Sequence, residues 1–123
     1  MTENEWDCQY DCPVEATVNV IGGKWKPQIL YYLHQGTQRH SDLKRGLPTI
    51  TQRMLTLQLR ELERDGIVKR TVYAQVPPKV EYSLTELGMT LAPILEAMFD
   101  WGEKYLETLK QQTTQKAIDS LKS

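Results

Sequence analysis

Hydrogen-bonding side chains of three kinds are concentrated between residues 49 and 60. The set comprises hydroxyl, amide and guanidinium groups: Thr49, Thr51, Gln52, Arg53, Thr56 and Arg60. Arginine can bond the O6 and N7 atoms of guanine in bidentate fashion, and glutamine can bond adenine in the same way. These residue types suit the recognition of base edges in DNA. The alternative is an ordinary solvent-exposed helix face, which would contain the same residue types.

An apolar stripe is expected on the side opposite these polar groups. Leu55, Leu59 and Leu62 recur at intervals of four and three residues, so all three share one face of a helix. Such a helix would bury its leucines in a core and leave the polar set outside.

The boundaries of this helix are also marked in the sequence. Thr49 and Gln52 match a capping box, in which each side chain binds the backbone N–H of the other residue. Pro48 disfavours helical geometry in the residue before it, so an earlier helix should end there. Asp65 and Gly66 predict the C-terminal end, because glycine readily adopts the left-handed conformation found after helices.

Two strand-like runs follow the helix. Residues 68–73 and 79–84 alternate well enough to form strands, with Pro77 and Pro78 in the loop between them because proline cannot donate to a strand ladder. A helix with a polar outer face followed by a hairpin predicts a winged helix-turn-helix. Lys79, in the wing, would contact the DNA backbone or minor groove.

Three helices are expected before this unit. The first follows Pro13, the second covers about residues 28–34, and the third is a short helix over about residues 41–45. Ser41 or a neighbour should cap the third helix. Gly22 and Gly23 suit a tight turn between the first two helices.

One long helix is expected after the hairpin, over about residues 86–109 with Thr85 as its cap. Its apolar stripe is too wide for a single contact, so we expect it to pack against a second subunit as well as its own core. The predicted fold is mainly α with a small β-wing (α+β), with N- and C-terminal dimerisation helices. The expected organisation is an N-terminal arm (1–11), a winged-helix domain (12–110) and a polar C-terminal tail (111–123).

Several stretches together resemble one protein family. They are 12–16 (CPVEA), 20–25 (VIGGKW), 47–55 (LPTITQRML), 59–66 (LRELERDG) and 77–85 (PPKVEYSLT). In these motifs, across about residues 12–106, the chain resembles the HxlR-type, MarR-like bacterial transcriptional regulators. His40 departs from the pattern, since the family usually has an aromatic residue there. The resemblance implies a homodimer on palindromic operator DNA, and a redox-sensing cysteine in some members at the position of Cys12.

Cys12 is a candidate sensor on chemical grounds too. It directly precedes Pro13 at a predicted helix start, where unpaired N–H groups and the helix dipole lower the pKa of a thiol. The acidic neighbours Asp7, Asp11 and Glu15 oppose this shift. A thiolate attacks oxidants and small electrophiles. The alternative is a small residue of ordinary reactivity at a helix start.

The charge distribution favours a nucleic-acid partner. The net charge is −1, yet residues 39–70 hold eight cations and four anions, which leaves +4 there and −5 elsewhere. No signal peptide and no apolar run of membrane-spanning length is visible. We therefore expect a cytoplasmic protein without membrane contact, whose two cysteines are reduced at rest.

Catalytic and metal-binding functions find little support. Between Cys12 and His34 lie 21 residues, more than the spacing of a zinc finger, so no metal is expected. Gly22-Gly23-Lys24 is followed by Trp25 rather than Ser or Thr, so it is no phosphate loop. No catalytic constellation emerges, which argues against an enzyme, and no cofactor is expected. The competing hypothesis is a winged-helix protein-interaction module that does not bind DNA.

Overall fold

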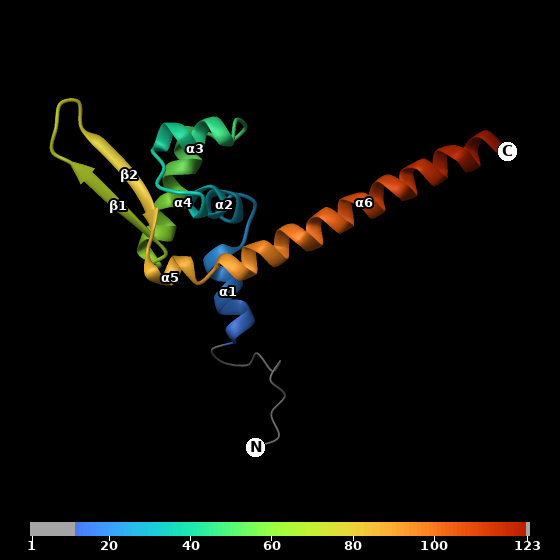
Figure 1. Ribbon diagram of the computed structural model, residues 1–123, viewed down its shortest axis with the longest axis horizontal. Coiled ribbons are helices and arrows are strands. Elements are labelled where there is room, and N and C mark those ends of the chain that lie inside the picture. Colours follow the sequence, from blue (N-terminus) through green and yellow to red (C-terminus); the bar gives the residue numbers. More distant parts are fainter. Residues whose placement is uncertain (1–11, 123) are drawn as a thin grey trace, which may run out of the picture. The chain divides into compact units, whose positions relative to one another are not determined.

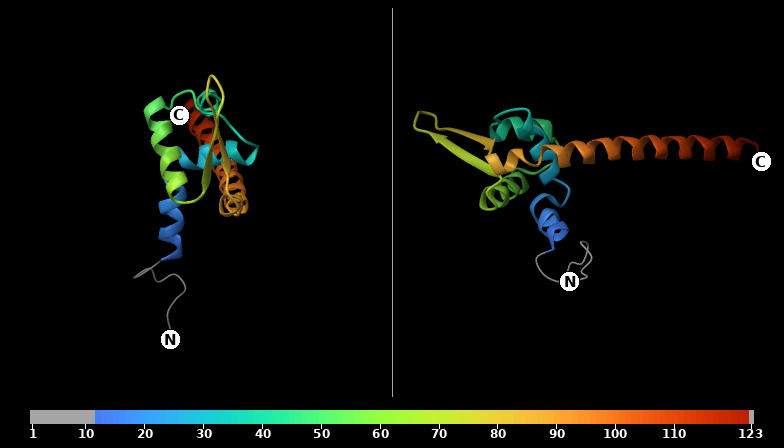
Figure 2. Two further views of the ribbon diagram at one scale, coloured as in Figure 1. Left: turned by 90° about the vertical axis from the view of Figure 1, so that its left-hand side faces the viewer. Right: turned by 60° about the horizontal axis from the view of Figure 1, so that its bottom comes forward.

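The computed structural model describes residues 12–122, which form six helices and one two-stranded antiparallel sheet. They fall into two compact units: the first ends at Thr90 and the second begins at Leu91. Figures 1 and 2 show the first unit as a cluster of short helices from which a hairpin projects. The elements of this unit are α1 (Pro13–Ile21), α2 (Lys26–His34), α3 (His40–Gly46), α4 (Gln52–Arg64), β1 (Val68–Tyr73), β2 (Lys79–Leu84) and α5 (Glu86–Met89).

Aliphatic side chains from successive elements form the core of the first unit. Those with less than 2% of their surface exposed are Ile29, Leu30, Leu43, Ile50, Leu55, Leu59, Leu62 and Val68. Burying one such side chain stabilises the fold by about 1.5–3 kcal/mol. The predicted apolar stripe of α4 is confirmed, because all three of its leucines belong to this set.

The start of α4 differs from the prediction. The N-cap is Thr51, whose Oγ1 accepts a hydrogen bond from the Met54 backbone N–H at 3.0 Å. The predicted cap, Thr49, lies instead in a turn that the Ile50 N–H closes by donating to the Leu47 carbonyl at 3.1 Å. Burial of Ile50 holds this turn in place and moves the helix start two residues along the chain.

Helices α2 and α3 are longer than the sequence indicated. Helix α2 begins at Lys26, with Pro27 in its first turn. Helix α3 begins at His40, and its N-cap is Arg39, whose backbone N–H donates to Asp42 Oδ2 at 2.9 Å. A neighbour of Ser41 therefore caps the helix, and it does so through backbone groups and a carboxylate.

The hairpin matches the predicted strands residue for residue. Its register runs from Val68 opposite Leu84 to Tyr73 opposite Lys79. The outer edge of β2 is joined to the segment before α3, because Gln38 and Tyr82 exchange two backbone hydrogen bonds of 3.0 and 2.7 Å. This bridge fixes the base of the wing beside the start of α3.

The long helix predicted after the hairpin is two helices. Thr85 caps α5 as expected, accepting from the Gly88 N–H at 3.0 Å, but α5 ends at Met89. Helix α6 (Ala92–Lys122) begins after a break of two residues. Pro93 explains the break, since its ring lacks an N–H and would clash with the carbonyl of Met89 in a continuous helix.

Helix α6 makes up almost all of the second unit. It continues to Lys122, so the predicted polar tail is helical over its described residues. None of the described helices combines the length and apolarity needed to cross a lipid bilayer. The expected arm, which contains Cys8, lies outside the described residues.

Candidate DNA-binding surface

The outer face of α4 brings together most of the predicted site residues. Gln52, Arg53, Thr56, Leu57 and Arg60 line one open concavity of about 560 Å³ on this face. Four of these five come from the set predicted from the sequence. Leu57 is the addition. It has no hydrogen-bonding group, so the pattern of polar residue types did not indicate it.

Two arginines on this face have no anionic partner among the described residues. In this part of the chain four cations are paired with carboxylates: Lys26, Arg45, Arg64 and Lys79. Within residues 12–122, Arg53 and Arg60 form no ion pair with any carboxylate, and both side chains are exposed. Unpaired guanidinium groups on a helix of this kind are suited to bind base edges or phosphates.

The Thr56 hydroxyl is already occupied within the fold. It donates to the Gln52 carbonyl at 3.0 Å, and it lies 3.2 Å from His40 Nε2. A neutral His40 with its proton on Nε2 therefore donates to Thr56 and links the start of α3 to α4. Burial lowers the pKa of His40, because desolvation disfavours the charged imidazolium. Thr56 therefore links α4 to α3, which leaves its hydroxyl less available to an external ligand.

Thr51 and Thr49 are at the start of the same helix. The Thr51 hydroxyl accepts from Met54 as the N-cap, yet its own proton remains available to donate. Thr49 is exposed in the preceding turn. Both lie near the unpaired N–H groups of the first turn of α4, a favourable place for a phosphate.

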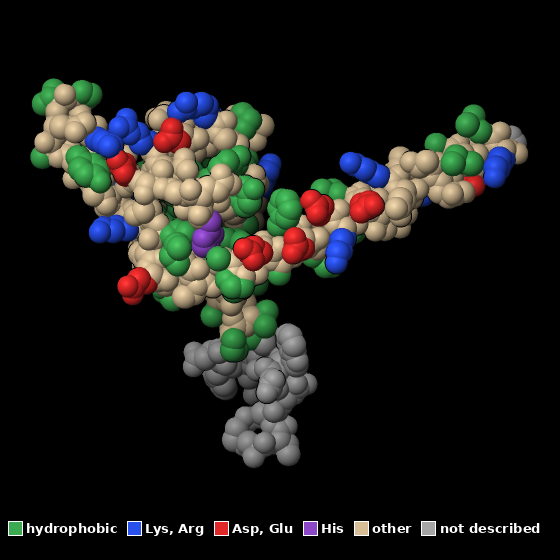
Figure 3. Space-filling view, viewed as in Figure 1, with side chains coloured by type: hydrophobic (Ala, Val, Ile, Leu, Met, Phe, Trp, Pro, Cys, Tyr) green, Lys and Arg blue, Asp and Glu red, His purple; other side chains and the backbone are tan. Residues whose placement is uncertain are grey.

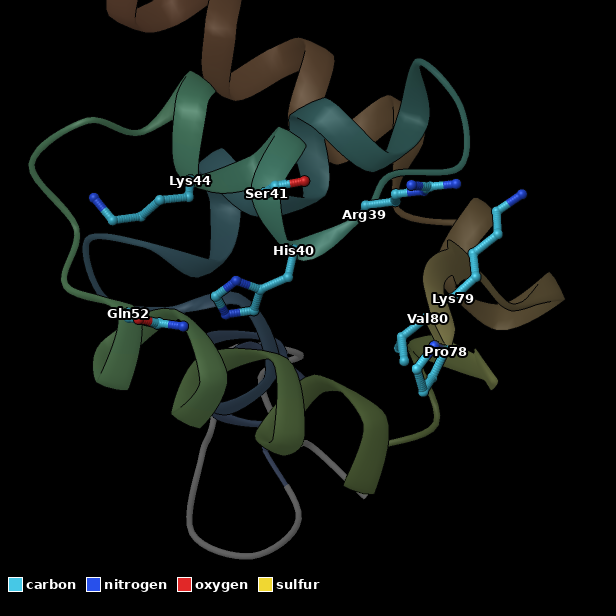
Figure 4. Close-up of a pocket in the computed structure, with 8 residues that line it drawn as sticks. All are labelled: Arg39, His40, Ser41, Lys44, Gln52, Pro78, Lys79 and Val80. Atoms are coloured by element: carbon cyan, nitrogen blue, oxygen red, sulfur yellow. The ribbon is translucent and has the colours of Figure 1, made fainter. Parts of the chain in front are cut away.

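A second concavity lies between α3, α4 and the wing. Figure 4 shows its lining residues, which enclose about 470 Å³: Arg39, His40, Ser41, Lys44, Gln52, Pro78, Lys79 and Val80. Of these lining residues, all from the described part of the chain, three are cations and none is a carboxylate. Figure 3 shows Lys and Arg side chains over α3 and the hairpin, with Asp or Glu side chains beside them. The concavity is therefore suited to an anionic backbone group.

Lys79 is only partly available to such a group. Its Nζ lies 2.7 Å from Glu81 Oε1 and 5.1 Å from the centre of the Tyr73 ring. The carboxylate neutralises much of the charge of Lys79, the wing residue that the sequence assigned to the DNA backbone or minor groove. Binding of a phosphate by Lys79 would compete with this ion pair.

An ion pair on another side of α4 holds the helix in place. Lys26 Nζ in α2 lies 2.7 Å from Glu61 Oε2, and Lys26 is buried. The hydrogen bond and the charge of Lys26 hold the pKa of Glu61 below its usual value. The pair also neutralises the charge of Glu61.

Cys12 is the N-cap residue of α1, as predicted, and only 4% of its surface is exposed. It is disulfide-bonded in this structure, which differs from the expectation of reduced cysteines at rest. The described part of the chain holds no cluster of three or more His, Cys, Asp or Glu residues arranged to bind a metal ion.

Comparisons with known proteins agree with this geometry. The family model described as HxlR-like helix-turn-helix matches residues 20–110. The HTH-type transcriptional regulator YdeP of Bacillus subtilis is 58% identical over 111 residues, which are 89% of this chain and 87% of YdeP. The solved structure of the redox regulator HypR in its reduced form superposes with a TM-score of 0.77 at 60% identity, over 80% of this chain and 98% of that chain.

A third similar protein is the transcriptional regulator YodB from B. subtilis. Its reduced form superposes with a TM-score of 0.68 at 34% identity, over 78% of this chain and 95% of that chain. The matched family and relatives are helix-turn-helix regulators, not enzymes. The winged helix-turn-helix fold, the arginines on α4 and these likenesses agree: the chain belongs to the HxlR-like helix-turn-helix family of transcriptional regulators.

Proposed function

We propose that this protein regulates transcription in the cytoplasm as a homodimer that binds palindromic operator DNA in a sequence-specific manner. This rests on one observation: the guanidinium groups of Arg53 and Arg60, on the exposed face of α4, form no ion pair with any carboxylate of residues 12–122. The opposite face of α4 is buried through Leu55, Leu59 and Leu62. A helix held in this way can present its outer face to the major groove.

The neighbouring elements would then hold the DNA backbone. With α4 in the major groove, the concavity lined by Arg39, Lys44 and Lys79 would receive a phosphate. Thr49 and Thr51 would contact backbone at the start of α4. Phosphate contacts fix the register of the protein on the duplex, while Gln52, Arg53 and Arg60 would distinguish bases.

The dimer is supported by apolar side chains that the single chain leaves exposed. Helix α6 exposes Ile94, Met98, Phe99, Trp101, Tyr105, Leu106 and Leu109, each by at least 38%. Helix α1 exposes Val14 and Val18 by 49 and 56%. So many large apolar side chains in two helices are unusual on a monomer surface, and a second copy of the chain would bury them.

Selection of bound fragments from genomic DNA with purified protein tests this proposal. A two-fold dimer places its recognition helices one DNA turn, or a multiple of it, apart. The selected fragments should share an inverted repeat with that spacing. Absence of any enriched sequence would contradict the proposal, and a single asymmetric site would contradict the dimer.

Lys79 is expected to act on the backbone. Lys79→Met should weaken binding to operator and scrambled duplexes alike, and should reduce the slope of log K against log salt by about 1. Glu81→Gln should strengthen binding to both duplexes at low salt, because it frees Lys79 from its 2.7 Å ion pair. Lys116→Ala, which removes one positive charge from α6, is the control. Loss of base preference in Lys79→Met would instead assign Lys79 to base recognition.

We further propose that Cys12 responds to oxidants or electrophiles. HypR is described as a redox regulator, with solved oxidised and reduced forms, and YodB has been solved after diamide treatment. Cys12 is disulfide-bonded here and adjoins α1, one of the two helices proposed for dimerisation. In this step two thiols lose two protons and two electrons to the oxidant and form one S–S bond. A bridge to Cys8 or to the partner subunit's Cys12 would change the angle between recognition helices.

The test compares wild type, Cys12→Ser and Cys8→Ser before and after diamide, with operator affinity as the readout. Wild type should change its affinity on oxidation and recover with a reductant, and Cys12→Ser should not respond. If Cys12 bridges to Cys8, Cys8→Ser should not respond to diamide. If Cys12 bridges to the partner subunit, Cys8→Ser should still respond and should form a covalent dimer on a non-reducing gel. A response that persists in Cys12→Ser, or no response in wild type, would contradict the sensing role.

A further inference from the structure

We propose that Leu57 contacts the 5-methyl group of a thymine in each operator half-site. The inference rests on the DNA-binding function proposed above and adds a residue that determines base specificity. It starts from the position of Leu57 on α4. With roughly 100° of rotation per helical residue, Leu57 lies about 140–160° around the helix from Leu55, Leu59 and Leu62, the buried stripe. Leu57 is therefore on the ridge of α4 that projects farthest from the core.

The exposure of Leu57 agrees with this position. Leu57 is 47% exposed, whereas the three stripe leucines are at most 1% exposed. A recognition helix inserts its outermost ridge deepest into the major groove. Leu57 is also the sixth residue of the helix, within the N-terminal half that meets the bases.

The surroundings of Leu57 favour DNA over another protein surface. Arg53 and Arg60, four residues before and three after it, share its face and line the same concavity. Both lack a carboxylate partner among the described residues. An apolar protein partner would have to bury two unpaired charges, which is costly. A polyanion with an apolar group in its groove can bind both arginines and also contact Leu57.

Thymine provides that apolar group. In the major groove the C5-methyl group of thymine is an apolar projection that distinguishes a T·A pair from the other base pairs. Apolar side chains contact this methyl group in protein–DNA complexes. Arg53 and Arg60 would bond guanine or phosphate on either side. Leu57 would cover the methyl group between them.

Deoxyuridine pairs with adenine as thymidine does but lacks the 5-methyl group. Replacing thymidine with deoxyuridine therefore removes this contact alone. Each thymine of the selected operator is replaced in turn, in both half-sites together. Wild type should lose about fourfold in affinity per half-site at one thymine position, the effect of removing one buried methyl group. Leu57→Ala should bind the thymine operator more weakly and show no loss at that position. Leu57→Met, which keeps an apolar side chain of similar volume, should retain most of the sensitivity.

The outcomes separate the two proposals. A wild-type protein that binds its selected operator no better than a scrambled duplex overturns the DNA-binding proposal, and this inference with it. A wild type that prefers its operator but is insensitive to every deoxyuridine replacement overturns only the thymine contact. So does a Leu57→Ala variant with an unchanged pattern of sensitivity. Because Leu57 is half exposed, its replacement should leave the circular dichroism spectrum unchanged.

Discussion

Arg53→Ala is expected to weaken operator binding by about 1–3 kcal/mol and to relax the base preference at one position in each half-site. Arg53 is the second residue of α4 and lies on its exposed face. Its guanidinium has no carboxylate partner among the described residues. It is free to form two parallel hydrogen bonds with guanine O6 and N7. Removal of both bonds in each half-site accounts for the loss, and binding titrations with single-base operator variants measure it.

Arg64→Ala is the matched control, because it removes the same group from the other end of the same helix. Arg64 Nε lies 3.4 Å from Asp65 Oδ1, so its charge is already paired. This variant should change operator affinity little and leave every base preference intact. Unchanged operator affinity in Arg53→Ala would rule out the proposed role of Arg53.

Ile94→Asp is expected to convert the protein to a monomer and to lower operator affinity by about 100-fold or more, because the two half-sites then bind independently. Ile94 is 39% exposed on the apolar side of α6, so the new carboxylate is tolerated in a single chain but not in an apolar interface. Light scattering measures the mass, and circular dichroism should show an intact fold.

Two further variants delimit this result. Gln111→Asp adds the same carboxylate to α6 at an exposed polar position about 100° around the helix from Ile94, and should remain a dimer. Leu95 is only 8% exposed, so Leu95→Asp should destabilise the fold itself. A wild-type protein that is monomeric at micromolar concentration, or an Ile94→Asp variant that remains dimeric, would contradict the proposed interface.

The hairpin and the buried face of α4 could be predicted because local signals agreed with one another. The period-two pattern and the Pro77-Pro78 loop gave both strands, and Gly66 adopts the expected left-handed conformation with φ 76°. The start of α4 could not be fixed in this way. Thr49 and Thr51 are equally good caps by type, and only the burial of Ile50 selects Thr51.

Other features of the structure were not predicted, because they depend on contacts between distant elements or on a local rule that competes with the helical pattern. The apolar pattern across residues 86–109 is helical throughout, whereas Pro93 interrupts the helix because its ring would clash with the carbonyl of Met89. The hydrogen bond between His40 and Thr56 joins residues 16 apart, so no local pattern indicated that the Thr56 hydroxyl is occupied. The pairing of Lys79 with Glu81 could have been anticipated, because residues two apart on a strand share a face.

Binding to the selected operator and to a scrambled duplex, measured at several salt concentrations, tests the central claim most directly. Sequence-specific binding through α4 predicts that both affinities fall linearly in log K against log salt, because phosphate contacts release counterions. The operator should remain tighter by about 10³-fold or more near physiological salt. Equal affinities for the two duplexes, or no salt-dependent binding to either, would contradict the claim and favour a winged-helix module that binds another protein.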